Sequence, residues 1–241
     1  MCNQAKGDEI VVKSMNAVGL ASFSNSIHSP ELMVQAREDY MTAIQLTNVA
    51  LRSPESAKKD STLFAVMILS IFEIIAGSTQ NSMVAWNEHI KGASALVKLR
   101  GREQFRTEAG QHLFGQVFSN LVTSCIQRAI PMPAYITELR EAITNSVVRA
   151  SPRWKVSSVI TDFTIFRAGV FHFQIKDPRK IVEGALELDR RFIAVTQDAH
   201  KVWPYHTVYT EKNPHLVIST MITLNLRHGT RYRHAASCST A

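Results

Sequence analysis

The fold class of this chain is clearest in residues 113–126, which read LFGQVFSNLVTSCI. Apolar pairs stand at 113–114, 117–118, 121–122 and 125–126, and polar or small residues fill the pairs between them. In a helix with about 3.6 residues per turn, this spacing places one broad apolar face along one side. The segment therefore predicts an amphipathic α-helix with its apolar face in the core.

A second helix is predicted immediately before this segment. Trp86, Ile90, Ala93 and Val97 form an apolar stripe at helical spacing, and the pattern stops at Leu99-Arg100-Gly101. Glycine readily adopts the left-handed conformation that ends many helices. We therefore expect Gly101 to break this helix.

The rest of the chain also has helical patterning, with few signals for strands. We expect further helices over about residues 9–24, 30–52, 60–76, 133–146, 154–176, 178–200 and 214–226. The β-branched residues within 156–173 leave a short strand open as an alternative, but no Asn-Gly or Asp-Gly turn stands beside them. The sequence predicts an all-α fold with short loops.

Prolines mark several of the expected helix ends. Proline is tolerated at the first helical position, and a preceding Ser, Asn or Asp can cap the helix. Ser29-Pro30, Asp177-Pro178 and Asn213-Pro214 therefore predict helix starts. Because the residue before proline avoids the α region, Ser53-Pro54 is expected to end one helix and Pro131-Met132-Pro133 to separate two.

Length and composition favour one helical domain that buries a sizeable core. The chain has 241 residues, of which 45% are hydrophobic. Its longest apolar run, Leu63 to Ala76, is interrupted by Ser70 and Glu73 and is shorter than the roughly 20 residues of a membrane span. The N-terminus lacks the features of a secretory signal. We expect a soluble protein with no membrane partner.

The positive charge is weak evidence for nucleic-acid binding. The formal net charge is +7, but the basic residues are dispersed, and the longest runs are the pairs Lys58-Lys59 and Arg190-Arg191. A nucleic-acid interface is usually a clustered patch. Arg227, Arg231 and Arg233 form the one local cluster, which a solvated terminus explains as well as a phosphate site does. We expect contact with DNA to be indirect only.

No metal site is predicted. A zinc cluster needs thiolates or imidazoles at close spacing, whereas Cys2, Cys125 and Cys238 lie far apart. The same spacing and odd number favour reduced thiols over a disulfide framework. Two histidine pairs, His200 with His206 and His228 with His234, have six-residue spacings that do not align side chains on a helix.

No catalytic or cofactor-binding residue is predicted either. Gly92-Ala93-Ser94-Ala95-Leu96 lacks the last glycine of a nucleophile elbow and lies in a helix, so Ser94 is expected to be structural. Phosphate-binding glycine motifs are also missing from the sequence. Glu73, within the most apolar helix, is interpreted as a paired structural carboxylate with Arg100 or His89 as its partner.

An ordered series of segments resembles the regulatory domain of fungal zinc-cluster transcription factors. That helical region commonly reads as Trp, His, Gly-Ala, then Arg-Gly and Gln-Phe, and the resemblance covers about residues 10–226. The matching segments are Asn48-Val49-Ala50-Leu51-Arg52-Ser53-Pro54, Asp60-Ser61-Thr62-Leu63, Phe72-Glu73, Trp86-Asn87-Glu88-His89-Ile90-Lys91-Gly92-Ala93, Leu99-Arg100-Gly101-Arg102-Glu103-Gln104-Phe105, Leu113-Phe114, Cys125-Ile126-Gln127-Arg128, Pro131-Met132-Pro133, and Trp203 with Tyr205-His206-Thr207.

The resemblance and the residues agree that these positions are architectural. Trp86 is expected to anchor the core, Gly92 to permit close helix packing and Gly101 to cap a helix. His89 is also expected to be structural, and a response to pH or to a ligand is the alternative for it.

Two departures from the family pattern affect the expected function. The six-cysteine cluster that binds DNA in this family is not found before Lys13. Residues 227–241 drift from the expected long helices into a sequence with Gly, Arg and Ser. We therefore expect a helical regulatory domain over residues 1–226, truncated at its C-terminus, and an irregular basic tail over residues 227–241.

The resemblance implies a nuclear transcription regulator that acts through protein contacts and lacks its own zinc cluster. Other transcription regulators or coactivators are the implied partners; homo- or heterodimers and a small-molecule inducer stay open. No cofactor and no enzymatic activity are expected. Two alternatives remain: a helical ligand-binding protein or enzyme with a pocket between helices, and an inactive truncated remnant.

Overall fold

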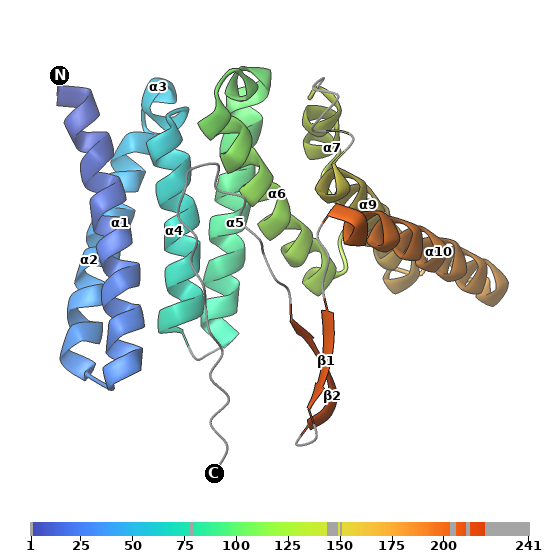
Figure 1. Cartoon of the computed structure of the whole chain (residues 1–241). Coiled ribbons are helices and arrows are strands. Elements are labelled where there is room, and N and C mark those ends of the chain that lie inside the picture. The colour runs from blue at the N-terminus through green and yellow to red at the C-terminus, as the bar shows by residue number, and fades with distance from the viewer. Residues whose placement is uncertain are drawn as a thin grey trace, which may run out of the picture.

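The fold is built from α-helices that follow one another through short connections (Figure 1). A computed structural model describes residues 2–77, 80–143, 149, 151–202, 206–210 and 213–219. The elements in chain order are α1 (Cys2–Ile27), α2 (Pro30–Leu51), α3 (Pro54–Ala57), α4 (Asp60–Ala76), α5 (Gln80–Arg100), the 3₁₀ helix η1 (Gly101–Arg106), α6 (Glu108–Arg128), α7 (Ala134–Glu141), α9 (Pro152–Phe171), α10 (Pro178–Val202), β1 (His206–Thr210) and β2 (Asn213–Ser219). The predicted all-α class is confirmed, with one short β-hairpin after the last helix.

Prolines and caps determine where most helices begin and end. α2 and α10 begin at Pro30 and Pro178, as predicted. α2 ends before Ser53-Pro54, and this proline also starts the short helix α3, which we did not predict. α9 begins at Pro152, two residues earlier than expected, because the hydroxyl of Ser151 accepts a hydrogen bond from the Trp154 N–H at 3.3 Å.

Three expectations about the C-terminal half need correction. Asn213-Pro214 begins strand β2 and not a helix; β2 pairs antiparallel with β1, and His206 lies opposite Ser219. The β-branched and aromatic residues of both segments suit this pairing, while residues 220–226 lie outside the described residues. The helix expected over 133–146 ends at Glu141. Residues 152–171 are helical, so the strand considered within 156–173 is excluded.

The N-terminal helices α1 and α2 pack closely through small residues. Ala17 and Ala21 of α1 and Ala36 and Ala43 of α2 are fully buried. Ala17, Ala21 and Ala36 form one apolar cluster with Phe72 of α4. Since alanine side chains are short, the helix axes can approach closely without a gap between them. The helix pair α1–α2 therefore packs against one side of α4.

The opposite side of α4 belongs to the main hydrophobic core. Leu63, Val66 and Met67 pack there with Trp86, Ile90 and Val97 of α5, with the apolar face of α6, and with Met132 and Ile136. In Figure 1, α1, α2, α4 and α5 stand side by side and α6 is inclined against them. The core position predicted for the apolar faces of residues 86–97 and 113–126 is thereby confirmed.

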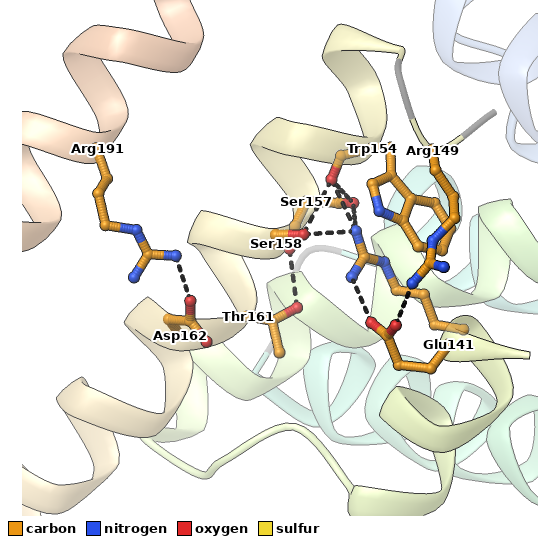
Figure 2. Close-up of polar contacts among 9 residues, drawn as sticks. Glu141, Arg149, Trp154, Ser157, Ser158, Thr161, Asp162 and Arg191 are labelled. Carbon is orange, nitrogen blue, oxygen red and sulfur yellow. Dashed lines mark hydrogen bonds and ion pairs between the residues drawn. The ribbon is translucent and has the colours of Figure 1, made fainter. Parts of the chain in front are cut away.

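Helices α9 and α10 form an antiparallel pair beyond α6, and α10 runs across the direction of the N-terminal helices (Figure 1). Arg167 Nε of α9 donates a hydrogen bond to the carbonyl of Ile126 on α6, at 2.9 Å. Gly184 permits the close approach of α10, because a Cβ atom there would lie 2.5 Å from Cε2 of Phe166. Arg191 of α10 also pairs with Asp162 of α9 (Figure 2). α9 is therefore tied both to α6 and to α10.

Candidate functional site

A pocket of about 990 Å³ lies between α4, α6, the end of α7 and the first turns of α9. Its size is at the upper end of the range for small-molecule sites, about 300–1,000 Å³. The described lining residues include Phe64, Met67, Gln111, His112, Leu113, Phe114, Gly115, Gln116, Phe118, Ser119, Val122, Thr123, Arg140, Ile143, Ser151, Arg153, Trp154, Val156, Ser157 and Ile160. Half of these residues have apolar side chains, and the charged ones are arginines.

The apolar wall of the pocket comes from α6. Phe114, Phe118 and Val122 are spaced by four residues, so they lie above one another on the same helix face. All three also belong to the main core, which fixes their positions. The periodicity that predicts the helix therefore also builds a rigid wall for the pocket.

Arg140, at the end of α7, connects the pocket to α9. Its Nη2 atom lies 2.7 Å from the Trp154 carbonyl oxygen and 2.9 and 2.8 Å from the hydroxyl oxygens of Ser157 and Ser158. The guanidinium also stacks on the Trp154 ring at 3.7 Å from its centroid. Because the Arg140 side chain is only 6% exposed, these contacts replace its lost hydration.

The charge around the pocket is positive. Glu141 lies between Arg140, at 3.8 Å, and Arg149, with which it makes a closer ion pair (Figure 2). Burial lowers the pKa of Arg140, and the Glu141 carboxylate opposes this shift. Arg153 lines the same pocket and makes no ion pair with another described residue. The guanidinium groups of Arg140 and Arg149 therefore share one carboxylate, and that of Arg153 has no carboxylate partner among the described residues.

A separate polar cluster joins α2, α4 and α5. The Tyr40 hydroxyl donates a hydrogen bond to the Glu73 carboxylate, and His89 Nε2 lies 3.0 Å from the Tyr40 oxygen. Since the one phenolic proton goes to Glu73, His89 must donate from Nε2 as the neutral tautomer. Burial raises the pKa of Tyr40 and lowers that of His89. Tyr40 is thus the hydrogen-bond partner of Glu73, and Nε2 of His89, one of the two partners considered from the sequence, lies 3.9 Å from the Glu73 carboxylate.

Arg100, the other partner considered for Glu73, pairs with Asp60 of α4 instead. The next residue, Gly101, adopts a φ of 58° and ends α5, as predicted. Gln104 then donates from Nε2 to the carbonyls of Val97 and Gly101, at 3.1 and 2.6 Å. The Arg-Gly and Gln residues of the family pattern therefore close the end of α5.

The other residues singled out in the sequence have mixed outcomes. Trp86 is buried in the main core, as expected. Ser94 lies inside α5 and its hydroxyl hydrogen-bonds to that of Tyr135, which agrees with a structural role. The expectation for Gly92 is wrong: it is exposed, and a Cβ atom there would meet nothing within 4 Å. No close packing depends on that glycine.

Sequence reasoning did not identify Arg140, Arg153 or Trp154. Ser151-Pro152 is a recognisable helix-start signal that would have placed Arg153 and Trp154 on the first turn of α9. The pairing of that turn with Arg140 could not be read from the chain, because it depends on how α7 and α9 meet. The histidines at 200, 206, 228 and 234, Trp203 and the arginines at 227, 231 and 233 lie outside the residues whose side chains the structure describes.

The metal and membrane expectations can be compared with the described residues only. Within these ranges, His, Cys, Asp and Glu side chains nowhere gather in a group of three or more that could hold a metal ion. Cys125 is buried and burial raises its pKa to about 11, so its thiol stays protonated. Among the same residues, none of the helices has both the length and the apolar character of a membrane span.

Comparison with known proteins assigns the N-terminal half of the chain to a family. No curated protein and no solved structure matches the chain. A family model described as a fungal specific transcription factor domain matches residues 2–123, from α1 into α6. This range contains Trp86, His89 and the Arg100–Gln104 closure of α5. The chain therefore belongs to the fungal specific transcription factor domain family.

Proposed function

We propose that this chain is a nuclear transcription regulator that acts through contacts with other proteins and not as an enzyme. The observation that carries the proposal is the family match over residues 2–123, which supports a role in transcription regulation. The roles of the residues in that range agree with it, since the motif residues Trp86, Arg100, Gly101 and Gln104 build the core and close a helix. A scaffold of this kind presents surfaces to partners.

An exposed apolar face on α10 supports contact with a partner protein. Val182, Leu186 and Ile193 are each at least half exposed. Their spacing of four and seven residues places them within about 40° of one another around the helix. Since apolar side chains gathered on one surface commonly mark protein interaction sites, we propose that this face contacts another transcription regulator or a coactivator.

We further propose that the chain reaches DNA through such a partner. A zinc cluster requires several thiolates that converge on the metal, and the three cysteines of this sequence are too widely spaced to supply them. Homodimers and heterodimers both fit this proposal, because the α10 face can meet a second copy or a different chain.

A tethered reporter assay tests the proposed function. Residues 1–241 are fused to a heterologous DNA-binding domain, and reporter transcription is compared with that of the DNA-binding domain alone. Activation or repression is expected. The Leu186→Glu variant should lose this effect because it places a charge on the exposed α10 face. Val49→Glu is the matched control, since Val49 is an exposed apolar residue on the distant helix α2.

The outcomes separate the steps of the proposal. A folded fusion without any effect on transcription would refute independent regulation. If Leu186→Glu and Val49→Glu reduce the effect on reporter transcription equally, the α10 face is not the contact surface. Trp86→Ala, which removes a core side chain, reports the effect of unfolding and should be silent in either case.

Binding of a small molecule is a second function that one observation favours. The pocket between α4, α6, α7 and α9 has the size and the mainly apolar lining of a ligand site. An enzyme would need a set of reacting groups there, and the described lining, which includes His112 and several hydroxyl side chains, contains no carboxylate and no cysteine. The pocket therefore favours ligand binding over catalysis.

A further inference from the structure

The pocket next to α6 combines an apolar wall with unbalanced positive charge. Phe114, Phe118 and Val122 supply the wall, and Trp154 lines the pocket from α9. Arg140 and Arg153 are its charged lining residues, and no Asp or Glu lies among the lining residues that the structure describes. Glu141 is the nearby carboxylate, and Arg140 and Arg149 already share it. An anionic group is therefore the complement of this site.

The two lining arginines have different positions and different tasks. Arg140 is nearly fully buried, and its Nη2 is saturated by contacts to Trp154, Ser157 and Ser158. Arg153 is exposed and makes no ion pair or side-chain hydrogen bond within the described part of the chain. Arg140 thus shapes the pocket and adds positive potential, while Arg153 has a guanidinium free to bind an anion directly.

Gly115 leaves room for the Arg153 side chain. A Cβ atom at Gly115 would lie 4.0 Å from Nη2 of Arg153, and nothing else is nearer. The guanidinium therefore lies against the bare backbone of α6, across from its own helix α9. A longer side chain at position 115 would occupy the space between the two helices.

We propose that this pocket binds a small molecule with a carboxylate on an apolar body. The carboxylate pairs with Arg153, and the apolar body lies against Phe114, Phe118 and Trp154. The site is lined from four segments, α4, α6, α7 and α9. A partner helix about 10–12 Å wide would instead need one open groove along its length. Ligand binding extends the proposed function and is measured on the purified chain, so either proposal can fail alone.

The test compares two aromatic probes that differ in charge. The purified 241-residue chain is titrated with 2-naphthoate and with its neutral counterpart 2-naphthamide by isothermal titration calorimetry. We expect saturable binding of 2-naphthoate at one site and affinity about tenfold weaker for 2-naphthamide, since a charge-assisted pair with Arg153 is available to the carboxylate alone. Absence of saturable 2-naphthoate binding to the folded chain would overturn the proposal.

Three variants locate the binding. Arg153→Gln should weaken 2-naphthoate binding about tenfold and leave 2-naphthamide binding unchanged. Arg179→Gln, an equal loss of charge at an exposed position on α10, should change neither. Gly115→Leu should occupy the space beside the Arg153 guanidinium and weaken the binding of 2-naphthoate, with thermal unfolding as the check that it folds. Equal effects of Arg153→Gln and Arg179→Gln, or full binding by Gly115→Leu, would place the ligand elsewhere.

A peptide control separates a small-molecule site from a protein groove. An acidic amphipathic helical peptide is titrated under the same conditions. Binding of the peptide but not of 2-naphthoate, with loss in Arg153→Gln, would show that the pocket is a docking site for a partner helix and that the small-molecule proposal is wrong. Binding of 2-naphthoate but not of the peptide is the expected result.

Discussion

Replacing Gly110 by alanine should destabilise the fold, although alanine is the better helix former. A Cβ atom at Gly110 would lie 1.9 Å from the carbonyl oxygen of Gln104 and 2.9 Å from its carbonyl carbon. Both are backbone atoms, so no side-chain rotation relieves the clash, and η1 must move away from α6. Overpacking of this kind costs about 1–3 kcal/mol, against a helix-propensity gain of at most about 1 kcal/mol. We expect a net loss of about 1–2 kcal/mol.

Two other helical glycines provide matched controls, because alanine at these positions is expected to raise the stability of the protein. A Cβ atom at Gly115, on the same helix, comes no nearer than 4.0 Å to another atom, and one at Gly92 on α5 meets nothing within 4 Å. Alanine should therefore stabilise the protein at both positions, by up to about 1 kcal/mol each. Gly92 also separates two interpretations, since the sequence alone predicted close packing there and hence a loss on substitution.

Equilibrium unfolding in urea, followed by far-UV circular dichroism, measures all three variants. The urea concentrations at the unfolding midpoints can be compared directly if the free energy of unfolding falls with urea as steeply in each variant as in the unsubstituted chain. We expect Gly92→Ala and Gly115→Ala at or above its midpoint and Gly110→Ala clearly below it. If Gly110→Ala unfolds at the same urea concentration as Gly115→Ala, the close approach of η1 to α6 is wrong.

Three further predictions concern the buried polar groups. Burial lowers the pKa of His89 from 6.5, so the stability that neutral His89 contributes to the fold is fully present above pH 6.5 and is lost as the pH falls through the lowered value. The melting temperature of the unsubstituted chain should therefore fall more on acidification than that of His89→Gln, and an equal dependence of melting temperature on pH would contradict this. Asp60→Ala should lower the free energy of unfolding, measured by urea titration, by about 2 kcal/mol, because it leaves the 5% exposed Arg100 side chain without its carboxylate partner. Arg100→Met removes the buried charge itself and should lower the free energy of unfolding by less. Cys125, in a variant whose other two cysteines are replaced by Ser, should react with Ellman's reagent at about pH 8 only after unfolding, because the thiol is buried and its pKa is raised; fast reaction of the folded protein would show that α6 opens.

The helices that local sequence specifies strongly were predicted well. Residues 113–126 and 86–97 have a complete apolar face, and Gly101 ends the second segment, so pattern and end signal agree. The prolines at 30 and 178 placed two further helix starts to the residue. In these segments the information lies within a few turns of the helix itself.

The prediction failed where a segment's structure depends on a distant partner. Asn213-Pro214 fits a helix start by local rules, yet residues 213–219 form a strand because residues 206–210 pair with them. Pairing between strands is a tertiary contact, and it overrides a weak local preference. Gly92 shows the same limit: its position in a family motif suggested a packing role, and only the arrangement of neighbouring helices shows that the space beside it is empty.

The candidate site was the least predictable part, because its groups come from segments that are remote in sequence. Phe114 and Phe118 were predicted to be buried, but the pocket beside them is formed with residues of α7 and α9 that the sequence pattern did not place there. The family match covers residues 2–123, which includes the α6 wall, whereas Arg140, Arg153 and Trp154 lie beyond it. The matched half thus supplies the scaffold and an apolar surface, and the charged groups come from the other half. The anion selectivity proposed for the pocket therefore belongs to α7 and α9 of this chain and does not follow from the family match.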